Sequence, residues 1–252
     1  METNSKDWRY TVMPAVFTWL KESESGALEI DFDETKRQAA SVLKAQGKGG
    51  SRFGGLVASG TLGENSYLSP EQRLALLKSL SDVAKEADVP LISGAAAETK
   101  EELAKIIEGL AAVGVDTVMV MPPKTKATPS DEEMYAYYAL AAATAKKVGI
   151  TIMPYNNPDA AGYHALSTDL LRKLSALPEV VALKISTLDV SIIETLIVEN
   201  KDLKILAVKE NKDLKNFIQD KLIDLVSEGR KKTKSRRFQR YVQQYHLAKV
   251  YL

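Results

Sequence analysis

Short apolar runs alternate with longer amphipathic segments along most of the chain. The apolar runs are rich in β-branched residues and lack strict alternation, as expected for strands that are buried on both faces. In the segments between them, apolar residues recur at helical spacing. The predicted strands cover residues 11–20, 56–59, 90–96, 117–121, 151–155, 180–185 and 204–208.

Polar capping residues mark where the predicted helices begin. Thr99 with Glu102, and Ser130 with Glu133, have the spacing of capping boxes, in which two side chains satisfy free backbone amides. Ser69 is followed by a proline, which is favoured in the first helical turn. The other predicted helices run from Asp31 or Asp33 to Gly47 and over residues 168–177 and 189–198.

Strand and helix alternate through these segments, and this order predicts an α/β protein with a parallel sheet covered by helices. No dinucleotide-binding glycine fingerprint follows the first strand, so we expect a closed (β/α)8 TIM barrel rather than an open sheet. The last unit is ambiguous, because residues 221–227 fit an eighth strand and equally the end of a helix from Lys212. The glycine-rich residues 47–55 lack the spacing of a phosphate-binding loop and are predicted to be a surface connection.

Composition fits a globular protein with a substantial core and restricts its chemistry. Hydrophobic residues make up 45% and charged residues 27% of the 252 residues, and no apolar run approaches the roughly 18 residues of a membrane-spanning helix. The polar N-terminus resembles neither a signal peptide nor a transit peptide. The absence of cysteine and the presence of only two histidines, His164 and His246, argue against disulfides, thiolate nucleophiles and multi-histidine metal centres. These features predict a cytoplasmic protein without a membrane partner.

The formal net charge of +1 hides a strong asymmetry. Residues 1–229 contain 26 Lys and Arg against 33 Asp and Glu, whereas residues 230–252 contain eight Lys or Arg and no acid. We therefore expect a barrel followed by a basic tail, which is helical because Phe238, Tyr241 and Tyr245 fall at helical spacing. Such a tail could bind RNA, an acidic membrane or a protein. A solvated helix packed on the acidic barrel is the favoured interpretation, and nucleic-acid binding is not expected.

Three of the predicted strands end in residues that could carry chemistry: the turn over residues 60–63 (GTLG), Tyr155 and Lys184. In a barrel the carboxyl ends of the strands meet on one face, where catalytic side chains collect. A lysine drawn into an apolar interior loses proton affinity, and its neutral amine can attack a ketone to form a Schiff base. The phenol of Tyr155 could relay protons, and backbone amides of the turn could hold a carboxylate.

Each of these residues also has an ordinary structural explanation. A lysine at a strand end is usually a surface residue with its ammonium in water, and a buried tyrosine usually packs in the core with its hydroxyl hydrogen-bonded. Gly60 and Gly63 could serve only the turn. His164 is interpreted as a loop residue, and the three tyrosines within residues 135–138 are interpreted as helix packing.

The motifs GLVASGTLGENSYLSPEQR, VMPP, MPYNNP and VVALKIS, in this order and spacing, resemble the dihydrodipicolinate synthase / N-acetylneuraminate lyase family. The resemblance covers residues 10–208. It implies a (β/α) barrel, usually tetrameric, that forms a Schiff base with pyruvate or another 2-oxo acid. By the same resemblance, Lys184 is the Schiff-base lysine, Tyr155 the acid/base and Thr61 a relay hydroxyl. Carboxylate binding is assigned in this way to the backbone of Thr61 and Leu62.

The sequence departs from the synthase branch of that family at several positions. Leu62 stands where the branch has a second hydroxyl residue, and Lys124 and Thr125 replace the relay tyrosine that follows the double proline. Asp159 and the two alanines after it replace an arginine that serves aspartate-semialdehyde recognition. After Val208 the family pattern ends, and a short basic tail replaces the usual helical extension.

We therefore expect a class I aldolase or lyase that acts on pyruvate or a related small 2-oxo acid, with Lys184, Tyr155 and Thr61 catalytic. The predicted substrate-binding residues are Gly60, Thr61, Leu62 and Gly63. The lysine supplies the electron sink, so neither a metal nor an organic cofactor is expected, and the resemblance implies a dimer or tetramer. The alternatives are a dehydratase or deaminase that uses the same imine, and a non-catalytic barrel whose basic tail binds a partner.

Overall fold

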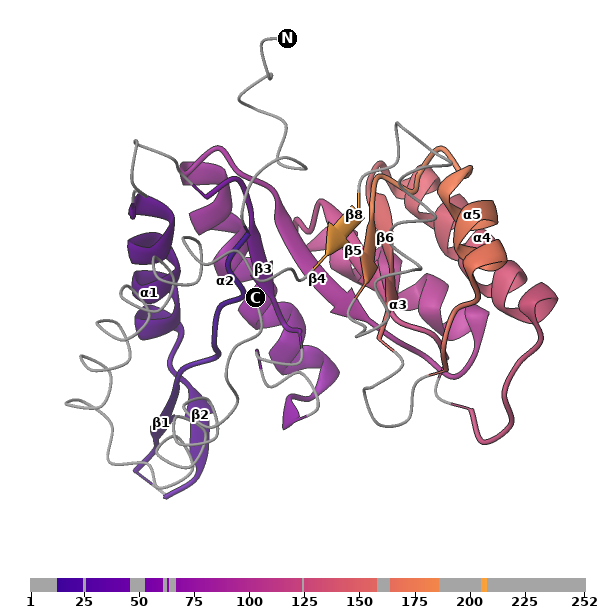
Figure 1. Ribbon diagram of the computed structural model, residues 1–252. Coiled ribbons are helices and arrows are strands. Elements are labelled where there is room, and N and C mark those ends of the chain that lie inside the picture. Colours follow the sequence, from indigo (N-terminus) through magenta and orange to yellow (C-terminus); the bar gives the residue numbers. More distant parts are fainter. Residues whose placement is uncertain are drawn as a thin grey trace, which may run out of the picture.

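The computed structural model describes residues 13–24, 26–45, 53–60, 63, 67–123, 125–157 and 164–185, together with the backbone of 205–207. Helices and strands alternate through this part of the chain (Figure 1). The strands are β1 (Leu20–Glu22), β2 (Leu28–Ile30), β3 (Leu56–Ala58), β4 (Leu91–Ala95), β5 (Thr117–Val120), β6 (Thr151–Asn156), β7 (Leu183–Ile185) and β8 (Ile205–Ala207). The helices are α1 (Phe32–Lys44), α2 (Pro70–Glu86), α3 (Lys100–Ala112), α4 (Asp131–Val148) and α5 (Thr168–Ser175).

The strands β3 to β8 form one parallel sheet in chain order. A helix follows each of the strands β3 to β6, and consecutive helices from α1 to α5 contact one another. Strands side by side in sequence order, with neighbouring helices packed outside them, are the arrangement of a (β/α) barrel, so the described residues form part of the predicted barrel. No helix among these residues is long and apolar enough to cross a membrane.

The predicted strand over residues 11–20 is wrong in its extent. Of its described residues, only Ala15 bridges to the sheet, in parallel to Val57 of β3. Pro14, which has no backbone N–H to continue a ladder, accepts a bond from the Val57 amide at 2.9 Å. The chain then continues into the antiparallel hairpin β1–β2, for which the sequence analysis predicted no element beyond Leu20. Gly26 provides the left-handed φ of 80° in the hairpin turn.

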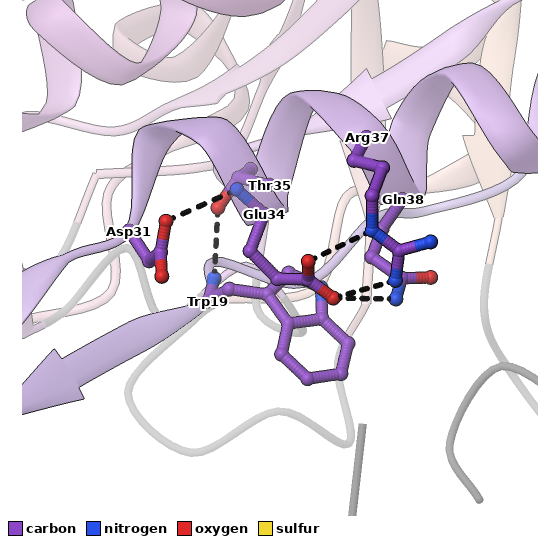
Figure 2. A network of polar contacts seen from close by, with 6 residues as sticks. All are labelled: Trp19, Asp31, Glu34, Thr35, Arg37 and Gln38. Carbon is purple, nitrogen blue, oxygen red and sulfur yellow. Dashed lines mark hydrogen bonds and ion pairs between the residues drawn. The ribbon is translucent and has the colours of Figure 1, made fainter. Parts of the chain in front are cut away.

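Helix α1 holds the segment that precedes the hairpin (Figure 2). Asp31 caps the helix as predicted, because its Oδ1 atom accepts a bond from the Glu34 amide at 3.0 Å. In the same turn, the Thr35 hydroxyl accepts a bond from the Trp19 amide at 3.0 Å. The Glu34 carboxylate also receives bonds from two side chains of the next turn. These contacts fix the backbone at Trp19, and therefore the position of Thr18 beside it.

The other predicted helix starts are confirmed within the described residues. The side chains of Ser69, Thr99 and Ser130 each accept a bond from the backbone amide three residues later, and Ser167 does the same for α5. Each cap satisfies an amide that has no partner inside the helix. The long helix α4 ends at Gly149, whose φ of 76° suits glycine.

Two apolar clusters lie on opposite faces of the sheet. The larger cluster packs the strands against the helices, and the smaller one contains no helix residue. In β7, Leu183 and Ile185 belong to the larger cluster, whereas the preceding Ala182 belongs to the smaller one. Because side chains alternate along a strand, Lys184 is on the same inner face as Ala182. The buried residues of this inner cluster are Ile92, Met119, Met121, Met153, Tyr155 and Ala182.

After residue 185 the structure describes only β8, which confirms the strand predicted over residues 204–208. The predicted helix over residues 189–198, the strand candidate 221–227 and the basic tail 230–252 lie outside the described residues. Most of the glycine-rich connection, over residues 47–52, also lies outside them.

Candidate active site

Lys184 in β7 lies directly beside Tyr155 in β6. The two residues are partners in the register of these parallel strands, and both are on the inner face of the sheet. The Lys184 Nζ atom lies over the Tyr155 ring, 4.1 Å from the ring centroid. The electron-rich face of the ring attracts an ammonium in this position. Since the hydroxyl is attached to the same ring, the amine and the phenol group lie next to each other on the inner face of the sheet.

Burial changes the acidity of the lysine. It lowers the pKa of Lys184 from the ordinary value of 10.5 to about 8, because an ammonium loses hydration in an apolar setting. None of the ion pairs among the described residues involves Lys184. At neutral pH about a tenth of the side chain is therefore the free amine, which is the form that attacks a carbonyl carbon. The residue as a whole is half-buried.

The end of β6 carries two polar residues with opposite orientations. Tyr155 is buried in the inner cluster, and its hydroxyl oxygen accepts a bond from the Asn157 Nδ2 atom at 3.0 Å. Asn156 points the other way, where its Oδ1 atom accepts from the Leu166 amide at 3.1 Å and its Nδ2 atom donates to the Leu166 carbonyl at 3.4 Å. Asn156 is fully buried and holds the loop that leads into α5. It is therefore a structural residue, whereas Tyr155 faces the lysine.

The glycine-containing turn after β3 packs closely against the end of its own strand. The Gly63 amide donates to the Gly60 carbonyl at 3.1 Å. A Cβ atom on Gly63 would lie 2.8 Å from the Ser59 nitrogen, so the turn requires glycine at this position. Ser59 is buried and has a φ of 51°, a left-handed conformation that is costly for a residue with a side chain. The surrounding packing holds the turn in this conformation.

Two residues from neighbouring segments support the turn. The Thr18 hydroxyl donates to the Gly63 carbonyl at 2.8 Å in a buried position. Gly94, in the middle of β4, lies under the turn, and a Cβ atom there would come within 3.2 Å of the Ser59 carbonyl oxygen. The missing side chain at Gly94 thus lets the turn approach the adjacent strand.

The turn borders the same inner cluster as the tyrosine. A Cβ atom on Gly60 would lie 3.8 Å from the Met119 Cε atom, and Met119 belongs to the cluster that contains Tyr155. Gly60 is therefore on the Tyr155 side of the sheet, and Gly63 packs back on Ser59 and Gly60. The other two residues predicted for this turn, Thr61 and Leu62, lie outside the described residues.

Other residues weighed in the sequence have structural roles. The His164 Nε2 atom contacts the Thr125 carbonyl oxygen at 3.0 Å and its hydroxyl at 3.2 Å, which joins two loops and confirms His164 as a loop residue. Tyr137 and Tyr138 are buried, and their hydroxyls bind backbone groups at Ala97 and Val120. Tyr135 is exposed, so the packing interpretation is wrong for that residue. Among the described residues, no group of three or more His, Asp or Glu side chains could hold a metal ion.

Sequence analysis missed three residues at this site. Asn157 could have been found, because it lies two positions after Tyr155 and a strand returns to the same face every second residue. Gly94 carried a weaker signal, since a glycine inside a strand often marks a close backbone approach. Thr18 carried no local signal, because its partner Gly63 is 45 residues away in the sequence.

Comparisons with known proteins identify the family and some relatives. Residues 31–217 match the dihydrodipicolinate synthetase family. The 4-hydroxy-tetrahydrodipicolinate synthase 2 of Halalkalibacterium halodurans is 35% identical over 130 residues, which cover 52% of this chain and 42% of that protein. The 4-hydroxy-tetrahydrodipicolinate synthase of Bacillus subtilis is 31% identical over 149 residues, which cover 58% of this chain and 49% of that protein. The matches thus span about half the length of these relatives.

Solved structures share the fold. A dihydrodipicolinate synthase from Bacillus anthracis superposes with a TM-score of 0.67 at 24% identity, covering 79% of this chain and 64% of that chain. A prophage protein of the dihydrodipicolinic acid synthase family from E. coli K12, in complex with pyruvate, has a TM-score of 0.67 at 21% identity, covering 83% and 67%. At these identities the likeness shows the barrel fold alone. The family match covers most of the chain, and the protein therefore belongs to the dihydrodipicolinate synthetase family.

Proposed function

We propose that this protein is a Schiff-base-forming lyase or aldolase that acts on pyruvate or a related small 2-oxo acid. The observation that carries the proposal is the Lys184 amine, which lies 4.1 Å from the centre of the Tyr155 ring on the inner face of the barrel. Burial lowers the pKa of this lysine to about 8, which supplies free amine near neutral pH. A tyrosine beside such an amine can move the protons that imine formation requires.

In the proposed reaction, the Lys184 nitrogen attacks the C2 carbonyl carbon of the 2-oxo acid and forms a carbinolamine. The Tyr155 phenol gives its proton to the carbinolamine hydroxyl, which leaves as water and produces an iminium ion. The resulting phenolate removes a proton from C3, and the electron pair of that C–H bond forms the enamine. The enamine carbon then attacks the carbonyl carbon of an aldehyde, whose oxygen takes the proton back from Tyr155, and water hydrolyses the regenerated iminium to free Lys184. In the reverse direction, C–C cleavage yields the enamine and an aldehyde, and protonation and hydrolysis release pyruvate. The iminium is the electron sink, so the proposed reaction needs no metal or organic cofactor.

We assign the substrate carboxylate to the turn from Gly60 to Gly63, with backbone amides of Thr61 and Leu62 as donors and the Thr61 hydroxyl as a proton relay. The buried hydrogen bond from Thr18 to the Gly63 carbonyl and the close packing of Gly63 on Ser59 support this assignment, because both hold Gly63, which follows the proposed donors. The relative from E. coli K12 that is complexed with pyruvate supports the substrate class. We further propose that the protein is a homo-oligomer and that it acts in the cytoplasm.

Reductive trapping tests the proposed function. Incubation with pyruvate and borohydride, followed by peptide mass mapping, is expected to yield a stable adduct on Lys184. Turnover assays of the unreduced protein with the 2-oxo acids that give an adduct, for C–C cleavage, loss of water and loss of ammonia, then separate an aldolase from a dehydratase or deaminase. If no adduct forms on Lys184 with any of several small 2-oxo acids, the protein is instead a non-catalytic barrel, and the basic tail becomes its candidate binding element.

A further inference from the structure

Asn157 lies at the carboxyl end of β6 and binds the Tyr155 phenol, which would move protons in the proposed active site. Its Nδ2 atom donates to the Tyr155 hydroxyl oxygen at 3.0 Å, and the side chain is partly buried. Asn157 follows the last residue of β6, on the same side as Tyr155, while Asn156 between them binds Leu166 on the other side. The two neighbouring asparagines therefore have different roles, and only Asn157 contacts the phenol.

We propose that Asn157 is a positioning residue that holds the Tyr155 phenol over Lys184 and stabilises the phenolate formed during imine chemistry. This inference rests on the proposed function. The hydrogen bond runs from the amide to the phenol oxygen, so the amide donates to the atom on which the phenolate charge would form. An amide donor cannot pass on a proton of its own at this site, which distinguishes its role from that of a hydroxyl relay.

In the described part of the loop after β5, the Thr125 hydroxyl contacts other loop residues and not the phenol. The synthase branch that the chain resembles has a relay tyrosine after the double proline, and this sequence has Lys124 and Thr125 there. The Thr125 hydroxyl donates to the Ala127 carbonyl at 2.8 Å and contacts His164 at 3.2 Å, so it is engaged within its own loop region. A fixed amide next to the phenol offers another way to support the same proton transfer.

Charge development explains why this contact can accelerate the reaction. When the phenol gives its proton to the carbinolamine hydroxyl, the negative charge appears on the oxygen that Asn157 already binds. Hydrogen bonds to charged groups are about twice as strong as those between neutral groups. The amide therefore stabilises the phenolate more than the phenol, and the phenolate regains its proton when it removes one from C3. Loss of this donor is expected to slow proton transfer about tenfold.

Exchange of the pyruvate methyl protons in D2O measures this step without an aldehyde partner. We compare wild-type protein with Asn157→Leu and Asn157→Asp, and normalise each rate to the fraction of Lys184 trapped by borohydride. The leucine variant, which lacks the donor, should exchange about tenfold more slowly. The aspartate variant, which matches asparagine in shape but places a carboxylate at the phenolate, should be slower still.

The order of the two variants separates electrostatic support from simple packing. If Asn157 only fills space, aspartate will behave like wild type and leucine will be the worse variant, and the inference is overturned. Exchange at the wild-type rate in both variants would also overturn it. In either case an intact Lys184 adduct would leave the proposed function standing, whereas absence of the adduct in wild-type protein would show that the proposed function itself has failed.

Thr125→Val serves as the matched control, because valine has the shape of threonine without the hydroxyl. Its exchange rate should equal that of wild type, since the Thr125 hydroxyl already donates within its own loop. A slowing as large as that of Asn157→Leu would show that the loop hydroxyl relays protons, and would overturn the inference.

Discussion

At the scale of single residues, the properties of Lys184 follow from the strand on which it lies. Leu183 and Ile185 point toward the helices, so the alternation of β7 directs the lysine to the inner face, next to Tyr155. There the ammonium is attracted to the face of the Tyr155 ring, but it loses much of its hydration. The loss of hydration lowers the pKa of Lys184 to about 8.

The lowered pKa predicts how imine formation depends on pH. With pyruvate and cyanoborohydride, the rate of Lys184 labelling should rise about tenfold per pH unit below about 8 and level off above it, because only the free amine attacks. Mass mapping of the labelled peptide gives the rate. Lys173→Met, at an exposed lysine of α5, is the control and should leave the profile unchanged. A profile that keeps rising to pH 10 would contradict the burial of Lys184.

The same pKa predicts a dependence of stability on pH. The unfolded chain holds the Lys184 proton up to its ordinary pKa of 10.5, whereas the folded chain releases it near pH 8. Between these values the unfolded state binds more protons, so the stability of wild-type protein should rise with pH through this window. Lys184→Met removes this dependence. Its gain in Tm over wild type should be largest below pH 8 and shrink toward pH 10.5, and a constant difference would contradict the prediction.

At the scale of elements, the turn after β3 depends on contacts with two other segments. Ser59, directly after β3, adopts a left-handed conformation. Gly94 of β4 has no side chain, which leaves room for the turn. The Thr18 hydroxyl of the N-terminal segment donates to the Gly63 carbonyl. The contacts of α1 with Trp19 in turn hold Thr18 in place. The positions of Gly60 and Gly63 therefore depend on packing between elements.

Gly94→Ala tests the close approach of the turn to β4. The new Cβ atom would lie 3.2 Å from the Ser59 carbonyl oxygen, so we expect a loss of about 1 kcal/mol of stability or more, and a several-fold higher KM for the 2-oxo acid. Gly109→Ala in α3 is the control, because its Cβ atom would meet Leu74 at an ordinary 3.8 Å and alanine favours the helix by about 1 kcal/mol. Urea unfolding and steady-state kinetics measure both effects. An unchanged KM in Gly94→Ala would separate the turn from substrate binding.

Thr18→Val tests the hydrogen bond that joins the N-terminal segment to the turn. Valine keeps the shape of threonine but leaves the buried Gly63 carbonyl without this donor, so unfolding should become easier by about 1 kcal/mol. Substrate affinity should fall with it, as measured by the pyruvate concentration that gives half-maximal trapping of Lys184. If stability falls and affinity does not, the bond holds the segment and has no effect on the carboxylate site.

At the scale of the whole molecule, the described residues already contain the lysine, the tyrosine, the asparagine and the supports of the turn. The proposed reaction uses no described group beyond β7, and the boundary between barrel and tail that we propose lies between residues 229 and 230. Deletion of residues 230–252 should therefore leave the yield of the Lys184 adduct unchanged. Mass mapping of the shortened protein checks this, and a collapse of its solubility would show instead that the tail is structural.

Sequence patterns predicted much of the fold because the signals involved are local. The caps at Ser69, Thr99 and Ser130 need only a side chain and the amide three residues later. The strands from β3 to β8 were recognisable as apolar runs between helices. The hairpin β1–β2 was missed because its short strands are mostly exposed and have no apolar run. The left-handed Ser59 was missed because no local pattern marks it.

By itself, the sequence determined the order of strands and helices and put Tyr155 and Lys184 near the ends of successive strands, since periodicity and capping act over a few residues. Only the tertiary structure decided that Tyr155 faces the lysine while Asn156 faces Leu166, and that Asn157 returns to the phenol. It also decided that Lys184 is buried deeply enough for its pKa to fall to about 8. These properties depend on which segments meet across the sheet, and such contacts join residues that are far apart in the chain.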